Sequence, residues 1–132
     1  SDVSAVAYGT MGPLLLHAAA FSPDISRVAL IDSLSSYHSA AATEYYAPRF
    51  IETFVPGVLR SYDLPLLAAA LAPRRIILHN TVDGGGRLLP VESVKREYAL
   101  AFAAFGSAKS ENNLVVGAGE DLKAPMTRLL ND

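Results

Sequence analysis

The turn at Gly9–Gly12 combines a hydroxyl group with the small residues that a nucleophile-bearing turn requires. Such a turn normally reads Gly-x-Ser-x-Gly, because the nucleophile sits in a strained conformation between a strand and a helix. Here Thr10 occupies the nucleophile position, Gly12 follows it, and Tyr8 stands in place of the leading glycine. A threonine hydroxyl attacks a carbonyl when a base is at hand, and the N–H of Met11 would stabilise the oxyanion. The alternative interpretation is a tight turn without chemistry.

An acid is the second part of such a site, and the sequence offers a candidate for it. In the chain order nucleophile, acid, histidine, the acid follows a later strand, which is where Asp83 stands. Its role would be to orient the histidine. Asp32, at the end of the second predicted strand, is a weaker contender. The competing interpretation of Asp83 is a flexible glycine-rich turn in which the carboxylate bonds the backbone of its own loop.

The base is the part that the sequence does not supply. A histidine is expected in the loop after the last strand, but that loop contains none. His17 falls in an apolar helix and His79 inside a strand, and both positions are typical of packing. His38 lies in an aromatic connector and could face a pocket. Glu120 or Asp121 could stand at the histidine position, although a carboxylate with an unperturbed pKa of about 4 is a poor base for a hydroxyl.

Aromatic side chains in the connector, residues 33–65, are candidates for contacts with a substrate. The segment is irregular, rich in tyrosine and interrupted by prolines. Its tyrosine rings could be stacking surfaces for a carbohydrate or a partner, and the candidate substrate-binding residues are Tyr37, His38, Tyr45 and Tyr46. The alternative is that these rings only cover a sheet.

The elements that must position these residues alternate between strands and helices. Apolar runs predict strands over residues 3–8, 27–32, 75–80 and 113–117. Helical patterns cover residues 13–21, 66–71 and 91–105, with Gly106 as the expected cap of the last one and a short helix after Pro125. The first helix is apolar all round, which predicts complete burial. The order predicts a single α/β domain over residues 1–132, a parallel sheet of about four strands with helices on both faces.

Composition excludes several classes of function. The net charge is −2 and the basic residues are scattered, so nucleic acid is not an expected partner. No apolar run reaches the roughly 18 residues that cross a bilayer, so no membrane span is expected. The sequence shows no metal-ligand spacing, no complete dinucleotide fingerprint and no phosphate loop. We therefore expect neither a metal nor another cofactor.

Several segments together are similar to one family. Gly9-Thr10-Met11-Gly12-Pro13-Leu14-Leu15-Leu16-His17-Ala18-Ala19-Ala20 resembles the nucleophile turn and following helix of bacterial α/β-hydrolases of the acetyl xylan esterase group. The remaining similar segments are Thr43–Tyr46, Val55–Leu59, Tyr62–Pro65, Leu71–Arg75 and Asp83.

The resemblance covers about residues 3–120 and implies the second half of an α/β-hydrolase fold. It implies hydrolysis of small acyl esters, such as acetyl groups on carbohydrate, through an acyl-enzyme and without a cofactor. Thr10 stands where the family has serine, nothing matches its histidine, and Asp83 matches its acid. Three hypotheses remain open: an ester hydrolase, a non-catalytic module that binds a carbohydrate or a partner, and an assembly subunit.

The first predicted strand also carries an expectation about partners. The family has further strands before it, so this strand is expected at an exposed sheet edge with unpaired backbone groups. We predict that a second copy of the chain, or a separate N-terminal chain, covers that edge.

Overall fold

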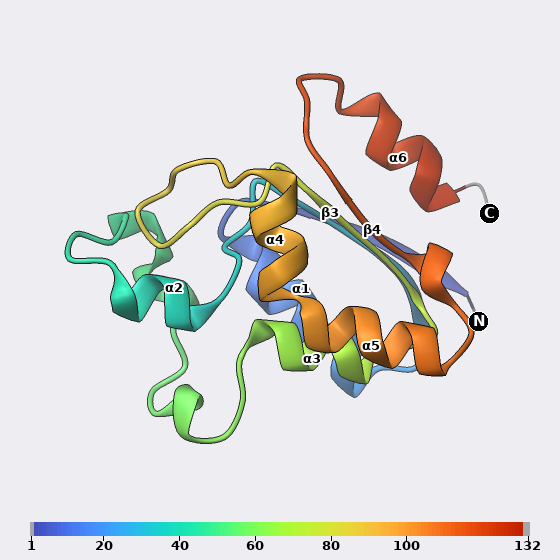
Figure 1. Ribbon diagram of the computed structural model, residues 1–132, viewed down its shortest axis with the longest axis horizontal. Coiled ribbons are helices and arrows are strands. Elements are labelled where there is room, and N and C mark those ends of the chain that lie inside the picture. The colour runs from blue at the N-terminus through green and yellow to red at the C-terminus, as the bar shows by residue number, and fades with distance from the viewer. Residues whose placement is uncertain (1, 131–132) are drawn as a thin grey trace.

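The computed structural model, which describes residues 2–130 apart from the side chain of Glu52, is built on a four-stranded sheet. The strands are β1 (Val3–Tyr8), β2 (Ile25–Ile31), β3 (Arg75–His79) and β4 (Leu114–Gly117). They lie side by side in sequence order and all pairs are parallel. Figure 1 views this sheet nearly edge-on, so its strands overlap in that picture. Parallel strands joined by helices are the arrangement that the alternating sequence predicts, and the prediction of an α/β fold is confirmed.

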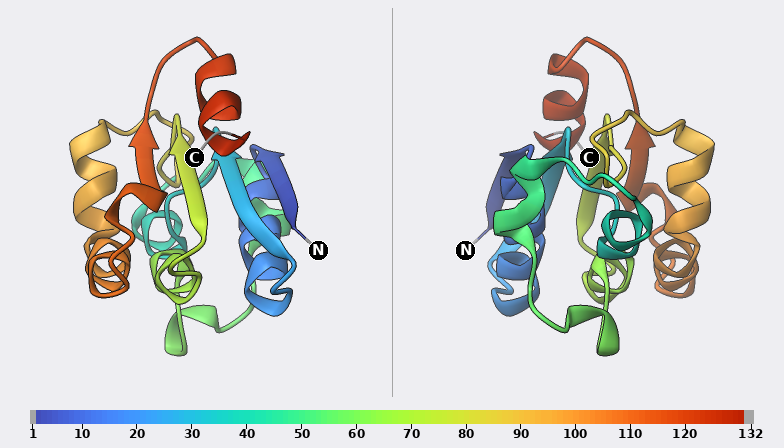
Figure 2. Two further views of the ribbon diagram at one scale, coloured as in Figure 1. Left: turned by 90° about the vertical axis from the view of Figure 1, so that its right-hand side faces the viewer. Right: turned by 90° about the vertical axis from the view of Figure 1, so that its left-hand side faces the viewer.

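Helices cover both faces of this sheet, as Figure 2 shows. One face carries α1 (Met11–Phe21), α3 (Leu64–Ala70), α4 (Val91–Glu97) and α5 (Ala99–Ser107), and the other carries α6 (Lys123–Leu130). Alternate residues of each strand point to opposite faces. The main core under α1, α3 and α5 therefore includes Val28, Leu30, Ile76 and Leu78, whereas Ala29 and Ile77 pack with Leu129 of α6.

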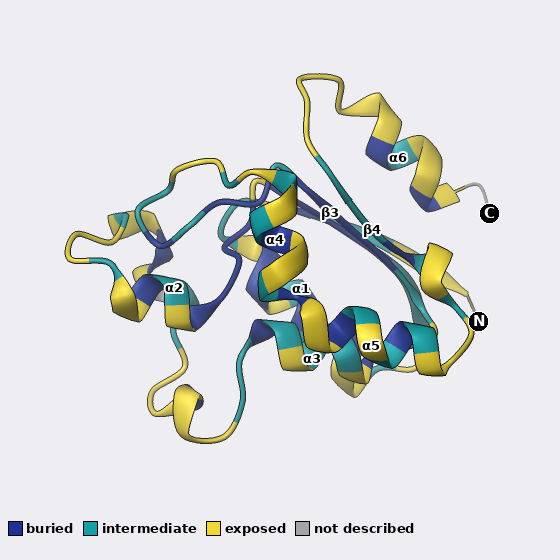
Figure 3. Cartoon of the chain, in the orientation of Figure 1, coloured by how far each residue is buried: buried dark blue, intermediate teal, exposed yellow. Residues whose placement is uncertain are grey.

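The connector predicted as irregular contains short helices. These are α2 (Tyr37–Ala42) and the 3₁₀ turns η1 (Pro48–Thr53) and η2 (Val58–Arg60). The segment with η1 lies near the carboxyl ends of the strands, whereas the segment with η2 projects away from them below α2, and all three are largely exposed (Figure 3). Four of their described residues are nevertheless buried in the main core, namely Tyr37, Ala40, Phe50 and Val58. The connector is thus docked at the edge of the sheet where a ligand is expected in a parallel α/β fold.

Two predictions about helix α1 are corrected. The helix begins at Met11 instead of Pro13, so the turn before it is shorter than expected. Its predicted complete burial is wrong, because Leu14 is 58% and Phe21 87% exposed. Leu16 and Ala19, on the opposite side of the helix, are buried against the sheet. An apolar sequence did not reveal which side of the helix faces water.

The helix predicted over residues 91–105 is two helices. They meet at Tyr98, whose φ of −98° and ψ of 21° interrupt the helical geometry. The buried Tyr98 hydroxyl donates a hydrogen bond to the carbonyl of Ser35 at 2.5 Å. Gly106 lies inside α5 and is not its cap. Lys109 takes the left-handed position at φ +55°, and the N–H of Ser110 closes the turn.

Strand β1 lies at one edge of the sheet, with Val3 43% and Tyr8 45% exposed. The partner expected to cover this edge stays a prediction. Among the described residues 2–130, none of the helices has both the length and the hydrophobicity of a membrane-spanning segment.

Arg74 fastens the C-terminal end of α1 to the start of β3. Its Nη1 donates to the carbonyl oxygens of Ala19, Ser22 and Ile25, at 2.7, 3.1 and 3.0 Å. These are carbonyls at or just after the end of the helix, where the partial negative charge of the helix dipole is concentrated. One half-buried cation therefore fixes the direction of α1 and, with it, the turn at the other end of the helix.

We expect Arg74→Ala to lower the free energy of unfolding by about 2 kcal/mol, because hydrogen bonds to a charged group are lost. Urea denaturation followed by circular dichroism measures this change. Arg60→Ala, at an exposed position in η2, is the matched control and should leave stability within about 0.5 kcal/mol. Equal effects of the two substitutions would contradict the anchoring role of Arg74.

Candidate functional site

Strands β1, β2 and β3 end at the same row of the sheet, and the residue that follows each strand has a left-handed backbone conformation. The residues are Gly9 (φ +56°), Asp32 (φ +54°) and Asn80 (φ +53°). Their N–H groups extend the parallel ladder by one step, donating to the carbonyls of Ile31, His79 and Gly117 at 2.8, 3.0 and 3.1 Å. Aspartate and asparagine tolerate this conformation better than most residues. At these residues the backbone turns away from the sheet, at the carboxyl ends of the strands.

A cleft of about 890 Å³ lies at this row. Its polar side chains come from five separate segments, namely the turns after β1, β2, β3 and β4 and the connector. The lining comprises Tyr8, Gly9, Thr10, Asp32, Arg49, Asn80, Val82, Gly86, Leu88, Gly119 and Glu120. We call this hollow the edge cleft.

Thr10 lies in the edge cleft, but its backbone is not strained. It is the N-cap of α1, with φ −66° and ψ −17°, and its side chain makes no capping hydrogen bond. The strained position expected for a nucleophile is taken by Gly9, where an added Cβ would meet nothing within 4 Å. The expectation that the strain falls on Thr10 is therefore wrong. The turn has the shape of a nucleophile turn, and the residue at its strained point has no side chain.

Met11 and Gly12 complete the turn after Thr10. Met11 is the first residue of α1, and the Gly12 N–H donates to the carbonyl of Gly9 at 3.1 Å. Gly12 is needed for packing, because a Cβ at this position would lie 1.8 Å from Oγ of Ser33. The Ser33 hydroxyl is buried and has no hydrogen-bond partner among the described residues. Helix α1 thus lies directly against the segment that follows Asp32.

Asp83 does not line the edge cleft. Its Oδ1 accepts hydrogen bonds from the N–H groups of Gly85 and Arg87, both at 2.9 Å, and its own N–H donates to the carbonyl of Arg87. The carboxylate therefore braces its own loop, as the competing interpretation of the sequence describes. Asp32, the weaker contender for the acid, shares the edge cleft with Thr10 and is exposed.

None of the three histidines lines the edge cleft. His17 in α1 donates through Nδ1 to the carbonyl of Pro13 at 2.7 Å and accepts from the Tyr62 hydroxyl at 2.9 Å. The Nε2 of His79 donates to the carbonyl of Gly119 at 3.1 Å. His38 is exposed in α2. The side chains of His17 and His79 thus hold neighbouring segments together, as the sequence favours.

The predicted substrate-binding residues lie in the connector and not in the edge cleft. Tyr37 and Tyr46 line an apolar hollow of about 550 Å³. The ring of Tyr46 lies edge-on to Phe54 at 5.6 Å, and Tyr45 is 80% exposed outside both hollows. The Tyr37 hydroxyl donates to the carbonyl of Thr53, and burial raises the pKa of Tyr37 to about 12. Tyr37 therefore packs and braces the connector and offers no free face for stacking.

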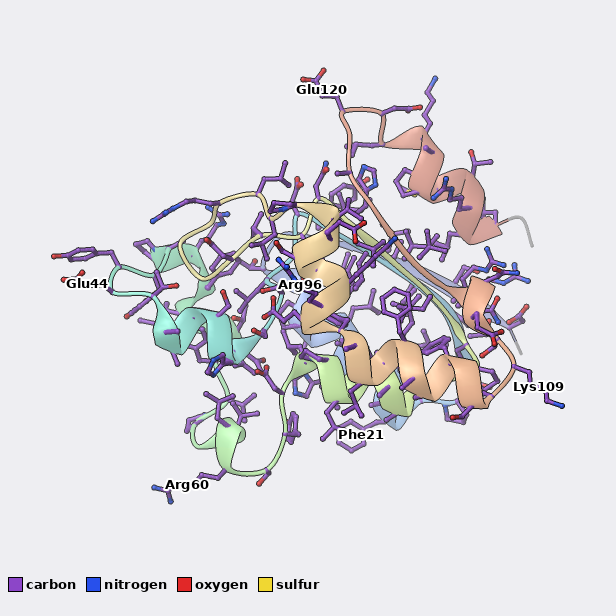
Figure 4. The ribbon with its side chains drawn as sticks, viewed as in Figure 1. Phe21, Glu44, Arg60, Arg96, Lys109 and Glu120 are labelled. Carbon is purple, nitrogen blue, oxygen red and sulfur yellow. The ribbon has the colours of Figure 1, made fainter. Side chains whose placement is uncertain are left out.

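Two polar residues of the edge cleft had no role in the sequence analysis. Two hydrogen bonds, both of 2.9 Å, join Asn80 to Gly119. The Nδ2 of Asn80 donates to the carbonyl of Gly119, and the N–H of Gly119 donates to the Oδ1 of Asn80. This pair holds the loop that carries Glu120 (Figure 4). Arg49 reaches the cleft from the connector. An Asn at a strand end was a usable signal, since it favours left-handed backbone. The sequence contains no such signal for Arg49, because the position of this residue depends on how the connector packs against the rest of the fold.

The edge cleft has a largely apolar lining that also carries acidic, basic and hydroxyl groups. Among the described residues, no three His, Asp or Glu side chains come close enough together to hold a metal ion. The lining side chains offer hydrogen-bonding groups and charges of both signs. Comparison with known protein families, curated protein sequences and solved structures finds no match to this chain.

The close contact at Gly12 yields a stability prediction with a matched control. We expect Gly12→Ala to lower the free energy of unfolding by about 2 kcal/mol, because the new methyl group overlaps Ser33. Gly106→Ala, in α5, meets no atom within 4 Å and should raise stability by about 0.5–1 kcal/mol through better helix propensity. Thermal unfolding of both variants measures the contrast. A Gly12→Ala variant as stable as Gly106→Ala would contradict the close packing.

Proposed function

We propose that this chain is a relative of the carboxyl-ester hydrolases whose edge cleft binds a small ester or carbohydrate ligand without forming an acyl-enzyme. The observation that carries the proposal is the composition of the strained turn. A nucleophile turn places its reactive side chain at the strained residue, and that residue is Gly9 at φ +56°. The recess that would receive the ligand is retained around a position that has no nucleophile.

The polar groups of the edge cleft support binding of a hydroxylated ligand. Asp32 and Glu120 present carboxylates, which accept hydrogen bonds from hydroxyl groups. The Thr10 hydroxyl is not used by its helix and can donate or accept. Leu88, which is 59% exposed, adds an apolar contact surface within the same lining. Few polar groups fixed on a sheet edge and placed beside an apolar surface are typical of small-ligand sites.

A second candidate function is ester hydrolysis by Thr10, and one observation favours it. The Thr10 hydroxyl lies in the same cleft as the carboxylate of Asp32 and is free of structural hydrogen bonds within residues 2–130. In this mechanism Thr10 would attack the ester carbonyl, and the Met11 N–H would bind the oxyanion. The exposed carboxylate of Asp32 would have to accept the proton of the Thr10 hydroxyl, and such a carboxylate is a weak base for a hydroxyl group.

Binding is tested by two-dimensional NMR titration with D-glucose and with methyl acetate. We expect the shifted amides to belong to the edge cleft, and we expect Asp32→Asn to weaken glucose binding about tenfold by removing a charged acceptor. Asparagine keeps the shape of the side chain and tolerates left-handed backbone. Tyr45→Ala is the control, because Tyr45 lies outside the cleft. Loss of binding in Tyr45→Ala alone would move the site to the connector.

Catalysis is tested by hydrolysis of p-nitrophenyl acetate. We expect the wild-type protein and Thr10→Ala to release p-nitrophenol at the same rate, because no side chain occupies the strained position. Thr127→Ala, which removes a hydroxyl from α6, is the control. Turnover that is lost in Thr10→Ala and kept in Thr127→Ala would establish the second candidate and overturn the first.

A further inference from the structure

Arg49 is the only cationic side chain that lines the edge cleft, as far as residues 2–130 are described. Its guanidinium forms no ion pair and no hydrogen bond with any described group, and it is exposed toward the cleft side of the connector. Arginine side chains on a protein surface are commonly solvated. Arg49 differs from them because its guanidinium has two neighbours, the Phe50 ring and the backbone of Gly86.

Two contacts hold the Arg49 guanidinium in place. Its central carbon lies 4.7 Å from the centroid of the Phe50 ring, and that ring is fully buried and cannot move away. On another side it lies against the backbone of Gly86, where an added Cβ would be 2.9 Å from Nη2 and 3.1 Å from Nη1. A stacked arginine loses little further freedom when it binds a ligand, so the donor fork is preorganised.

We propose that Arg49 binds a carboxylate group of the ligand, so that the edge cleft selects a hydroxylated carboxylic acid, of the sugar-acid type, over its neutral counterpart. This inference rests on the proposed function, because it names the ligand class for the same cleft. The guanidinium offers parallel N–H donors that match a carboxylate in a bidentate pair. A neutral ligand leaves those donors to water.

The acidic side chains of the cleft determine the orientation of such a ligand. Asp32 and Glu120 repel a carboxylate and accept hydrogen bonds from hydroxyls, whereas Arg49 attracts the carboxylate. The three side chains come from the turn after β2, the loop after β4 and the connector, so charge of opposite sign is presented from different segments. A ligand with a carboxylate on one part and hydroxyls on another satisfies both sets of groups. A ligand that carries only negative charge does not.

D-glucuronate and D-glucose test this inference, because they differ only in the group at carbon 6. We expect isothermal titration calorimetry to give glucuronate an affinity about tenfold higher than that of glucose. Arg49→Met keeps an unbranched side chain over Phe50 and removes the charge. It should abolish the preference while leaving the affinity for glucose unchanged. Arg49→Lys keeps the charge without the planar fork and should retain only part of the preference.

Arg60→Met is the matched control, because Arg60 projects from the connector on the side of the molecule opposite Glu120 (Figure 4). It should keep the full preference for glucuronate. Equal affinity for the two sugars in the wild-type protein, or an undiminished preference in both Arg49→Met and Arg49→Lys, would overturn the inference. If Arg49→Met does not fold, as judged by circular dichroism, Arg49→Lys decides the question. Failure of the proposed function looks different, because then neither sugar shifts the cleft amides and Asp32→Asn changes nothing.

Discussion

The edge cleft depends on one backbone constraint. Three neighbouring parallel strands end at the same row of the sheet, and each is followed by a residue with a left-handed backbone conformation. Gly9, Asp32 and Asn80 each extend the ladder by one hydrogen bond and then turn away from it. For residues other than glycine this conformation costs roughly 1 kcal/mol or more. The cost is tolerated because the neighbouring strand supplies the acceptor for each N–H. The outward turns open space at the edge of the sheet and place side chains of three loops around it.

The second requirement is that the connector is fixed to the rest of the fold. Asp63 accepts hydrogen bonds from the N–H groups of Tyr37, His38 and Leu64, at 2.7, 3.0 and 2.7 Å. One carboxylate therefore holds the start of α2 and the start of α3 together. Near the middle of the connector, the Ala47 N–H donates to the carbonyl of Gly84 at 2.8 Å. These bonds bring the only basic side chain of the described edge cleft to the glycine-rich loop.

At the turn after β1, the backbone conformation and the position of the hydroxyl group do not coincide. The left-handed backbone position that a nucleophile turn uses is present, but a glycine occupies it without strain. The hydroxyl of the next residue sits on relaxed helical backbone. The glycine two positions beyond Thr10 is retained for a steric reason, because the start of α1 contacts Ser33. Packing therefore preserves the geometry of the turn whether or not the turn carries a reactive group. A motif of small residues is evidence for close packing before it is evidence for catalysis.

The sequence by itself determined the class of fold and the position of every strand to within about two residues, because buried parallel strands are continuous apolar runs. It also predicted Thr10 and, as the weaker contender for the acid, Asp32 as strand-end candidates, since ligands of parallel sheets bind at the carboxyl ends, and both line the edge cleft. Tertiary structure decided which of two aspartates reaches the site. Asp83 is held by amides of its own loop, whereas Asp32 turns into the edge cleft through a conformation that only the neighbouring strand stabilises.

The break at Tyr98 and the position of Arg49 were likewise decided by tertiary contacts, with Ser35, Phe50 and Gly86. The contacts of Tyr98 with Ser35 and of Arg49 with Gly86 join residues far apart in the chain, and local patterns of hydrophobicity carry no information about them.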